Sequence, residues 1–127
     1  DLAREVYLRV VDRRVETLVM ACLSNANTLL SVQTVSTGTV NAVNLPFREV
    51  VNIALSVGAV RVLLAHNHPE GDAVPSRDDI RVTQELMDIL RPLGIELLDH
   101  IIVGAQLPDG RGYFPMRESA VIGLWNS

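Results

Sequence analysis

The sequence has little of several residue types, and each scarcity excludes a class of protein. Cys22 is the only cysteine in 127 residues, so no disulfide framework can form. The chain has eleven basic and fifteen acidic residues, and its net charge of −4 argues against a generic nucleic-acid surface, which is normally basic. No apolar run reaches the roughly 18 residues of a membrane span, and no signal peptide is visible. We therefore expect a cytoplasmic protein with no membrane segment and a reduced, buried Cys22.

Aromatic residues are also scarce, at 4%, whereas hydrophobic residues make up 48% of the chain. Aliphatic side chains must therefore build the core. A length of 127 residues suits one domain that buries roughly two thirds of its unfolded surface. The chain begins at Asp1 rather than at methionine, so we expect residues 1–127 to be a single-domain fragment.

The most informative stretch joins an expected strand to an expected helix. The apolar, β-branched run at 59–65 predicts a buried strand. Apolar residues at positions 82, 86, 89 and 90 recur at helical spacing and predict a helix over 76–90. Two histidines follow the strand, and an acidic cluster opens the helix. A loop over 69–75, with a glycine and two prolines, connects them.

This arrangement is suited to holding a metal ion. His66 and His68 are two residues apart, so on an extended backbone both imidazoles point to the same side. Pro69 biases His68 toward that geometry. Zinc sites that do chemistry usually have three protein ligands, and a carboxylate commonly completes two histidines. We expect Asp79 to be the third ligand, with the Ser76 hydroxyl directed toward the open metal position.

A purely structural interpretation also fits part of this pattern. Ser76 and Asp79 have the spacing of a helix cap, with Ser76 at the N-cap and Asp79 near the positive end of the helix dipole. Such a cap contributes only about 1 kcal/mol and is common. The combination of four residues on one strand-loop-helix unit favours the metal site.

The same residues carry a family resemblance. His66-x-His68, followed by Ser76 and Asp79, resembles the signature of the JAMM (MPN-type) zinc metalloproteases. The fuller string, His66-Asn67-His68-Pro69-x-Gly71 followed by Pro75-Ser76-x-x-Asp79, is similar to the RadC branch of that group. The similarity extends from about Glu16 to Arg117. Its further matches are Gly38-Thr39, Pro46-x-Arg48-Glu49-Val50 and Leu98-Asp99-His100-Ile101-Ile102-Val103-Gly104.

The resemblance implies a fold, a cofactor and a reaction. The implied fold is α/β, a three-layer α-β-α architecture of the JAMM/MPN (cytidine-deaminase-like) type with a mixed central sheet. The implied metal is Zn2+, held by His66, His68 and Asp79, and the implied bond is a peptide or isopeptide amide. Ser76 would donate to the oxyanion of the tetrahedral intermediate. The family also carries a further N-terminal segment, which we expect this chain to lack.

The general base is assigned from the same resemblance. A glutamate opens a strand well upstream of the paired histidines in the JAMM pattern, and Glu16 occupies that position, 50 residues before His66. It would take a proton from the attacking water and give it to the leaving amine. Glu49 is the rival, although it falls in the first turn of an expected helix, where an acid is favoured anyway. A structural partner of Arg13 or Arg14 is the other interpretation of Glu16.

Other histidine-containing families do not match. HNH nucleases spread their residues over a longer unit, and zinc deaminases need a Pro-Cys-x-x-Cys that one cysteine cannot supply. His100 is the only other histidine. As a fourth ligand it would remove the open position, so we expect a structural role or a hydrogen bond near the site.

The remaining segments predict a compact sheet with helices. We expect a helix at 2–12, or a strand at 6–11 in its place, and a hairpin of strands at 16–23 and 28–36. A helix at 46–57 should end at Gly58. Sheet segments at 95–99 and 100–103 should precede a turn at 107–112, a strand at 113–115 and an apolar end at 119–125.

Three functions stay open at this point. The favoured one is a zinc metallopeptidase with a peptide or protein substrate. A DNA-repair-associated accessory domain with a structural or vestigial metal site is the second, and a protein-binding scaffold is the third. The acidic charge gives no support for direct nucleic-acid binding by this fragment, so any link to DNA would come through the missing segment or a partner.

Overall fold

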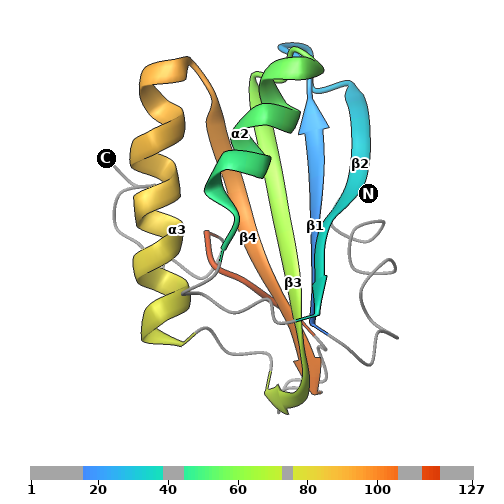
Figure 1. Ribbon diagram of the computed structural model, residues 1–127, viewed down its shortest axis with the longest axis vertical. Coiled ribbons are helices and arrows are strands. Elements are labelled where there is room, and N and C mark those ends of the chain that lie inside the picture. The colour runs from blue at the N-terminus through green and yellow to red at the C-terminus, as the bar shows by residue number, and fades with distance from the viewer. Residues whose placement is uncertain (1–15, 39–44, 73–75, 106–112, 118–127) are drawn as a thin grey trace.

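A computed structural model of the chain describes residues 16–38, 45–72, 76–105 and 113–117. The described part alternates strands and helices (Figure 1). Its elements in chain order are β1 (Glu16–Leu23), β2 (Leu29–Gly38), α2 (Phe47–Ser56), β3 (Arg61–Asp72), α3 (Arg77–Leu90), the 3-10 turn η2 (Arg91–Leu93), β4 (Glu96–Ala105) and β5 (Tyr113–Pro115).

The strands form one mixed sheet in the order β2-β1-β3-β4-β5. β3 and β4 are parallel, and the other neighbouring pairs are antiparallel. Because parallel neighbours need a crossover connection, α3 runs back along the sheet between them. The α/β class and the mixed sheet are as predicted.

Both described helices pack on the same face of the sheet (Figure 1). One core cluster joins alternate residues of the strands to the apolar stripes of α2 and α3. Its fully buried members include Leu18, Met20, Leu64, Leu86 and Leu90. The helix predicted at 2–12 lies outside the described residues. The predicted turn at 107–112 and the apolar end at 119–125 also lie outside them.

A second, smaller apolar cluster lies on the opposite face of the sheet. Its buried members are the intervening strand residues Val19, Ala21, Leu63, Ala65, Ile101 and Val103. The central strands are therefore apolar on both sides, which is why β1 and β3 appear in the sequence as continuous hydrophobic runs. None of the helices in the described part of the chain is long and apolar enough to cross a membrane.

The helix boundaries follow local chemistry. α3 begins after Ser76, whose side chain accepts a hydrogen bond from the backbone N–H of Asp79. α2 ends before Gly58, which has φ of +71°, a left-handed conformation that glycine adopts without strain. Gly94 has φ of +74° and ends η2 in the same way.

Two details differ from the sequence prediction. β3 continues through both histidines to Asp72, where the sequence had predicted a loop from residue 69. Pairing with β4 sustains it, although the register shifts between Asn67 and Asp72. Ile89, predicted on the buried stripe of α3, is 38% exposed, and Met87 is buried in that helix.

The packing of α3 on the sheet gives a stability prediction. Leu86→Ala should lower the free energy of unfolding by about 2–5 kcal/mol, because the side chain is fully buried and its removal leaves a cavity. Ile89→Ala on the outer face of the same helix should cost about 1 kcal/mol or less. Urea denaturation of both variants measures the difference. Equal losses would contradict the packing described here.

The buried thiol of Cys22 gives a pH prediction. Burial raises the pKa of this thiol from 9.0 to about 11. The unfolded chain therefore loses its thiol proton first as the pH rises, and the free energy of unfolding should fall between pH 9 and pH 11. Cys22→Ala should remove this part of the pH dependence. Rapid reaction of the native thiol with a disulfide reagent at pH 8 would contradict it.

Candidate metal centre

The two histidines of β3 point to the face of the sheet that the helices cover. Val62 and Leu64 belong to the core cluster on that face, and strand alternation carries His66 and His68 to the same side. The two Nε2 atoms lie 3.1 Å apart. His66 is buried, with 3% of its surface exposed, whereas His68 is partly exposed.

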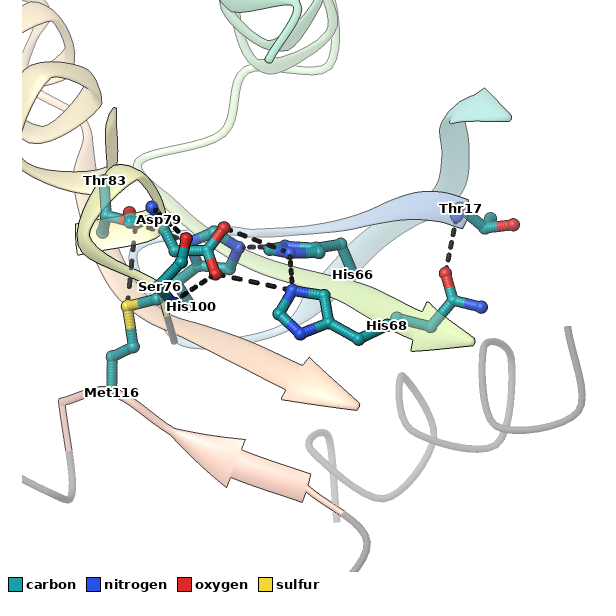
Figure 2. Close-up of polar contacts among 9 residues, drawn as sticks. Thr17, His66, His68, Ser76, Asp79, Thr83, His100 and Met116 are labelled. Atoms are coloured by element: carbon teal, nitrogen blue, oxygen red, sulfur yellow. Dashed lines mark hydrogen bonds and ion pairs between the residues drawn. The ribbon is translucent and has the colours of Figure 1, made fainter. Parts of the chain in front are cut away.

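Asp79 reaches the histidines from the first turn of α3. Its Oδ1 lies 3.4 Å from Nε2 of His66, and its Oδ2 lies 3.4 Å from Nε2 of His68 (Figure 2). The ligand atoms of the three residues lie within 4.8 Å of one another. The three side chains that the sequence singled out as ligands therefore converge, and they could hold a metal ion.

The carboxylate of Asp79 also serves the helix cap. Ser76 N–H donates to its Oδ2 at 2.8 Å, and Asp79 N–H donates to Ser76 Oγ at 3.0 Å, which forms a reciprocal capping box. The two interpretations of the sequence pattern are therefore compatible. The cap fixes the backbone that aims Asp79 at the histidines.

The electrostatics of Asp79 favour its ionised form. Burial opposes ionisation, but hydrogen bonds from His66 and His68, together with the charge of His66 and the Ser76 N–H, hold the pKa of Asp79 well below its ordinary value. A carboxylate that stays ionised across the working pH range is ready to bind a cation.

Ser76 is exposed at the mouth of this cluster. Its Oγ is occupied as an acceptor by Asp79 N–H, but its hydroxyl proton remains a donor. The geometry is compatible with the predicted hydrogen bond to a developing oxyanion.

Glu16 stands on the strand next to the histidines. β1 pairs with β3 in antiparallel register, with Leu18 opposite His66. Glu16 lies two residues before Leu18, so strand alternation places both on the same face of the sheet as His66. Because the strands are antiparallel, Glu16 lies farther along β3, in the direction of His68. Its side chain is half-buried. A hydrogen bond of 2.6 Å from Thr17 N–H to Asn67 Oδ1 ties the two strands together at this level.

The rival glutamate occupies a different environment. Glu49 lies in the first turn of α2 and is exposed. Among the interactions of the described residues, none joins Glu49 to His66, His68 or Asp79. Its position is that of an acid near a helix N-terminus, where the dipole favours it.

His100 lies behind His66 and does not belong to the ligand triad. Its Nε2 is 2.7 Å from Nδ1 of His66, the ring nitrogen opposite the one that faces Asp79. Its Nδ1 is 2.6 Å from Oγ1 of Thr83, and the residue is 1% exposed. Burial, with the nearby charge of His66, lowers the pKa of His100 well below its ordinary value. His100 is therefore a neutral hydrogen-bonding partner.

Thr83 was not singled out from the sequence. The signal that could have indicated it is its spacing, because it follows Asp79 by four residues and so occupies the same helix face one turn on. Its partner His100, however, is 17 residues away on β4, and the sequence of that strand does not show which side chain of α3 His100 contacts.

Comparison with known proteins identifies several similar chains. Residues 1–121 match the RadC-like JAB domain family. A UPF0758 protein of Methanosarcina acetivorans is 37% identical over 122 residues, covering 96% of this chain and 51% of that protein. A UPF0758 protein of Streptococcus sanguinis is 38% identical, and the match covers 92% of this chain and 49% of that protein. A UPF0758 protein of Vibrio cholerae is 42% identical, and the match covers 70% of this chain and 57% of that protein. The chain thus spans about half the length of the curated relatives it matches.

Mutation can separate the two roles of Asp79, in the helix cap and in the possible metal site. Ser76→Ala should lower the free energy of unfolding by about 1 kcal/mol through loss of the cap, yet leave one metal ion bound per chain. Asp79→Asn keeps a side-chain oxygen for the Ser76 N–H but loses the charge, so metal binding should weaken strongly while stability in the absence of metal changes less. Denaturation without metal and titration with Co2+ measure the two effects. Unchanged Co2+ binding by Asp79→Asn would contradict the triad.

Proposed function

Because the chain belongs to the RadC-like JAB domain family, we propose that it is a zinc-dependent metallopeptidase-type hydrolase that acts on a peptide or isopeptide bond. The observation that carries the proposal is the convergence of His66, His68 and Asp79 from two elements onto one point. A structural cap alone needs neither histidine, so it leaves this convergence unexplained.

The donor set fits zinc. Two imidazole nitrogens and one carboxylate oxygen are typical of catalytic zinc sites. Bonds of about 2.0–2.1 Å in a tetrahedron place neighbouring ligand atoms about 3.3–3.4 Å apart. Here the two Nε2 atoms lie 3.1 Å apart, and each lies 3.4 Å from a different oxygen of Asp79. With one ligand atom taken from each residue, the three atoms lie within 4.8 Å of one another. The same arrangement suits the oxygen-preferring ions Mg2+ and Ca2+ poorly, since two of its three donors are nitrogen.

A bound zinc ion would supply Lewis acidity, which polarises a carbonyl group and acidifies water. The proton is handled by the protein. We assign this task to the Glu16 carboxylate, which would accept a proton from the attacking water and return it to the nitrogen of the leaving amine. The register of β1 against β3, which directs Glu16 to the face that bears the histidines, supports this assignment over Glu49.

Ser76 would stabilise the charge that develops on the carbonyl oxygen. Its Oγ is held by Asp79 N–H at 3.0 Å, so its free hydroxyl proton can be donated with little reorganisation. Preorganised donors of this kind are typically worth about 10²–10³ in rate.

The substrate class follows from the chemistry. A carbonyl polariser, a proton carrier and an oxyanion donor suit an amide bond, and the partner would be a peptide or an isopeptide-linked protein in the cytoplasm. The net charge of −4 does not favour DNA as a ligand of this part of the chain. The relatives are about twice as long, so their further residues could add partners.

The proposal is tested by comparing two glutamates. Purified protein reconstituted with one equivalent of Zn2+ should cleave members of a peptide and isopeptide panel. Glu16→Gln should lower kcat by about 10²-fold or more with Zn2+ still bound, because it removes only the proton carrier. Glu49→Gln, an equivalent change on exposed α2, should leave kcat within about twofold.

Two outcomes would count against the proposal. Stoichiometric zinc binding without cleavage across the panel would favour a protein-binding scaffold. Loss of activity in Glu49→Gln with none in Glu16→Gln would transfer the proton-carrying role to α2.

A further inference from the structure

We propose that Asn67 is a positioning residue whose side-chain amide holds Glu16 beside the paired histidines but outside their ligand set. The inference rests on the proposed function, since it takes Glu16 as the proton carrier and the histidines as metal ligands. It depends on one hydrogen bond between β1 and β3, which Figure 2 shows as the dashed line that ends at Thr17.

The main chains of β1 and β3 stop pairing at the level of the site. The last pair in their antiparallel register is Leu18 opposite His66. Both strands continue beyond this pair, and each pairs there with its other neighbour. Glu16 and Thr17 pair with β2, and Asn67 pairs with β4. A fork therefore opens between β1 and β3 beside the histidines.

The side chain of Asn67 bridges this fork. Hydrogen-bonded pairs recur at every second residue of an antiparallel ladder, so a ladder continued from Val19 opposite Ala65 would join the main chains of Thr17 and Asn67. Thr17 N–H donates instead to Oδ1 of Asn67, at 2.6 Å. Thr17 and Asn67 are 0% and 2% exposed, so this N–H needs an acceptor within the protein. The side-chain oxygen takes the place of the ladder carbonyl.

The fork decides how closely Glu16 approaches the ligands. In a continued register Glu16 would lie directly opposite His68, two residues on from the last pair. Residues directly opposite in a ladder have Cβ atoms about 4.5–5.5 Å apart. At that range a carboxylate reaches the imidazole and any cation bound to it, so Glu16 would become a fourth ligand. In the described part of the chain, Glu16 forms no ion pair with a histidine.

A position outside the ligand set suits a proton carrier. A fourth protein ligand would fill the place that a catalytic metal site keeps for water or substrate. A carboxylate held farther back can accept a proton from a water molecule in that place. The Asn67 bridge fixes the main chain at Thr17, the residue that follows Glu16, and so it sets this separation.

Two variants of nearly equal shape test the bridge. Asn67→Asp keeps the oxygen that accepts from Thr17 N–H, whereas Asn67→Leu has the same branching and no acceptor. The visible spectrum of bound Co2+ reports its ligand geometry. Asn67→Leu should change this spectrum, because Thr17 N–H turns to the main-chain carbonyl of residue 67 and Glu16 becomes a ligand. Asn67→Asp should keep the wild-type spectrum, since residue 67 faces away from the histidines by strand alternation.

A second substitution shows whether Glu16 causes the spectral change. Glu16→Gln alone should leave the Co2+ spectrum of the protein unaltered, since Glu16 is not a ligand in the wild type. In the Asn67→Leu background, Glu16→Gln should restore the wild-type spectrum. A merely structural role of Asn67 would make the spectral change independent of residue 16.

Kinetics and a measurement on the wild type complete the test. With Zn2+ and a peptide that the wild type cleaves, Asn67→Leu should lower kcat by about 10–100-fold with little change in KM. Asn67→Asp should retain most of the activity. In the wild type, an NMR scalar coupling across the hydrogen bond should connect the Thr17 amide nitrogen to the side-chain carbonyl carbon of Asn67. This coupling needs no variant, so the inference stays falsifiable even if Asn67→Leu does not fold.

The outcomes separate this inference from the proposed function. Absence of the coupling, a wild-type Co2+ spectrum that changes with Glu16→Gln, or an Asn67→Leu spectrum that Glu16→Gln does not restore would overturn the role of Asn67. An Asn67→Leu spectrum identical to that of the wild type would also overturn it. The expected coupling and spectra without cleavage of any peptide would overturn the hydrolase and leave the Asn67 bridge standing. A wild type that binds no Co2+ would overturn both.

Discussion

The structure depends on the burial of one carboxylate between two imidazoles at the junction of β3 and α3. Asp79 is 3% exposed, and an isolated carboxylate in such a place would cost several kcal/mol. His66, His68 and the Ser76 N–H compensate for this cost because they provide hydrogen bonds and charge at both carboxylate oxygens. The three side chains are therefore arranged so that they could accept an ion.

The topology explains why this junction lies where it does. The parallel pair β3 and β4 requires a crossover, and the crossover helix must start near the carboxyl end of β3. The histidines lie near the middle of β3, and the N-terminus of α3, with its positive dipole and acidic first turn, brings Asp79 to them. Ligand sites at the carboxyl ends of strands are the general rule in α/β sheets. The antiparallel neighbour β1 then adds Glu16 from the opposite direction.

Stability and function share atoms in this site. The capping box uses the same carboxylate that faces the histidines, and the same serine that could donate to a substrate. Behind them, Thr83 and His100 connect the helix backbone to the ring of His66. A helix and a strand hold the three residues that could bind a metal, which is the condition for a preorganised site. One consequence is that mutations near Asp79 will usually change folding and chemistry together.

The sequence by itself determined the local features of the site. The spacing of His66 and His68 predicts one shared direction on any extended backbone, and Ser76-x-x-Asp79 predicts a capped helix start. Both predictions need only the periods of strand and helix, which are properties of neighbouring residues. The strand at 16–23 and the helix start after Ser76 followed from the same periods, whereas the α/β class with a mixed sheet was implied by the family resemblance.

Tertiary structure decided what depends on residues far apart in the chain. The contact of His66 with His100 joins positions 34 apart, and the placement of Glu16 on the strand beside the histidines needed the register of β1 against β3. The extension of β3 to Asp72 needed its pairing with β4, and the exposure of Ile89 needed the true orientation of α3. No local sequence pattern encodes these contacts and positions, because the packing of the whole sheet determines which strands pair and which buried groups form hydrogen bonds.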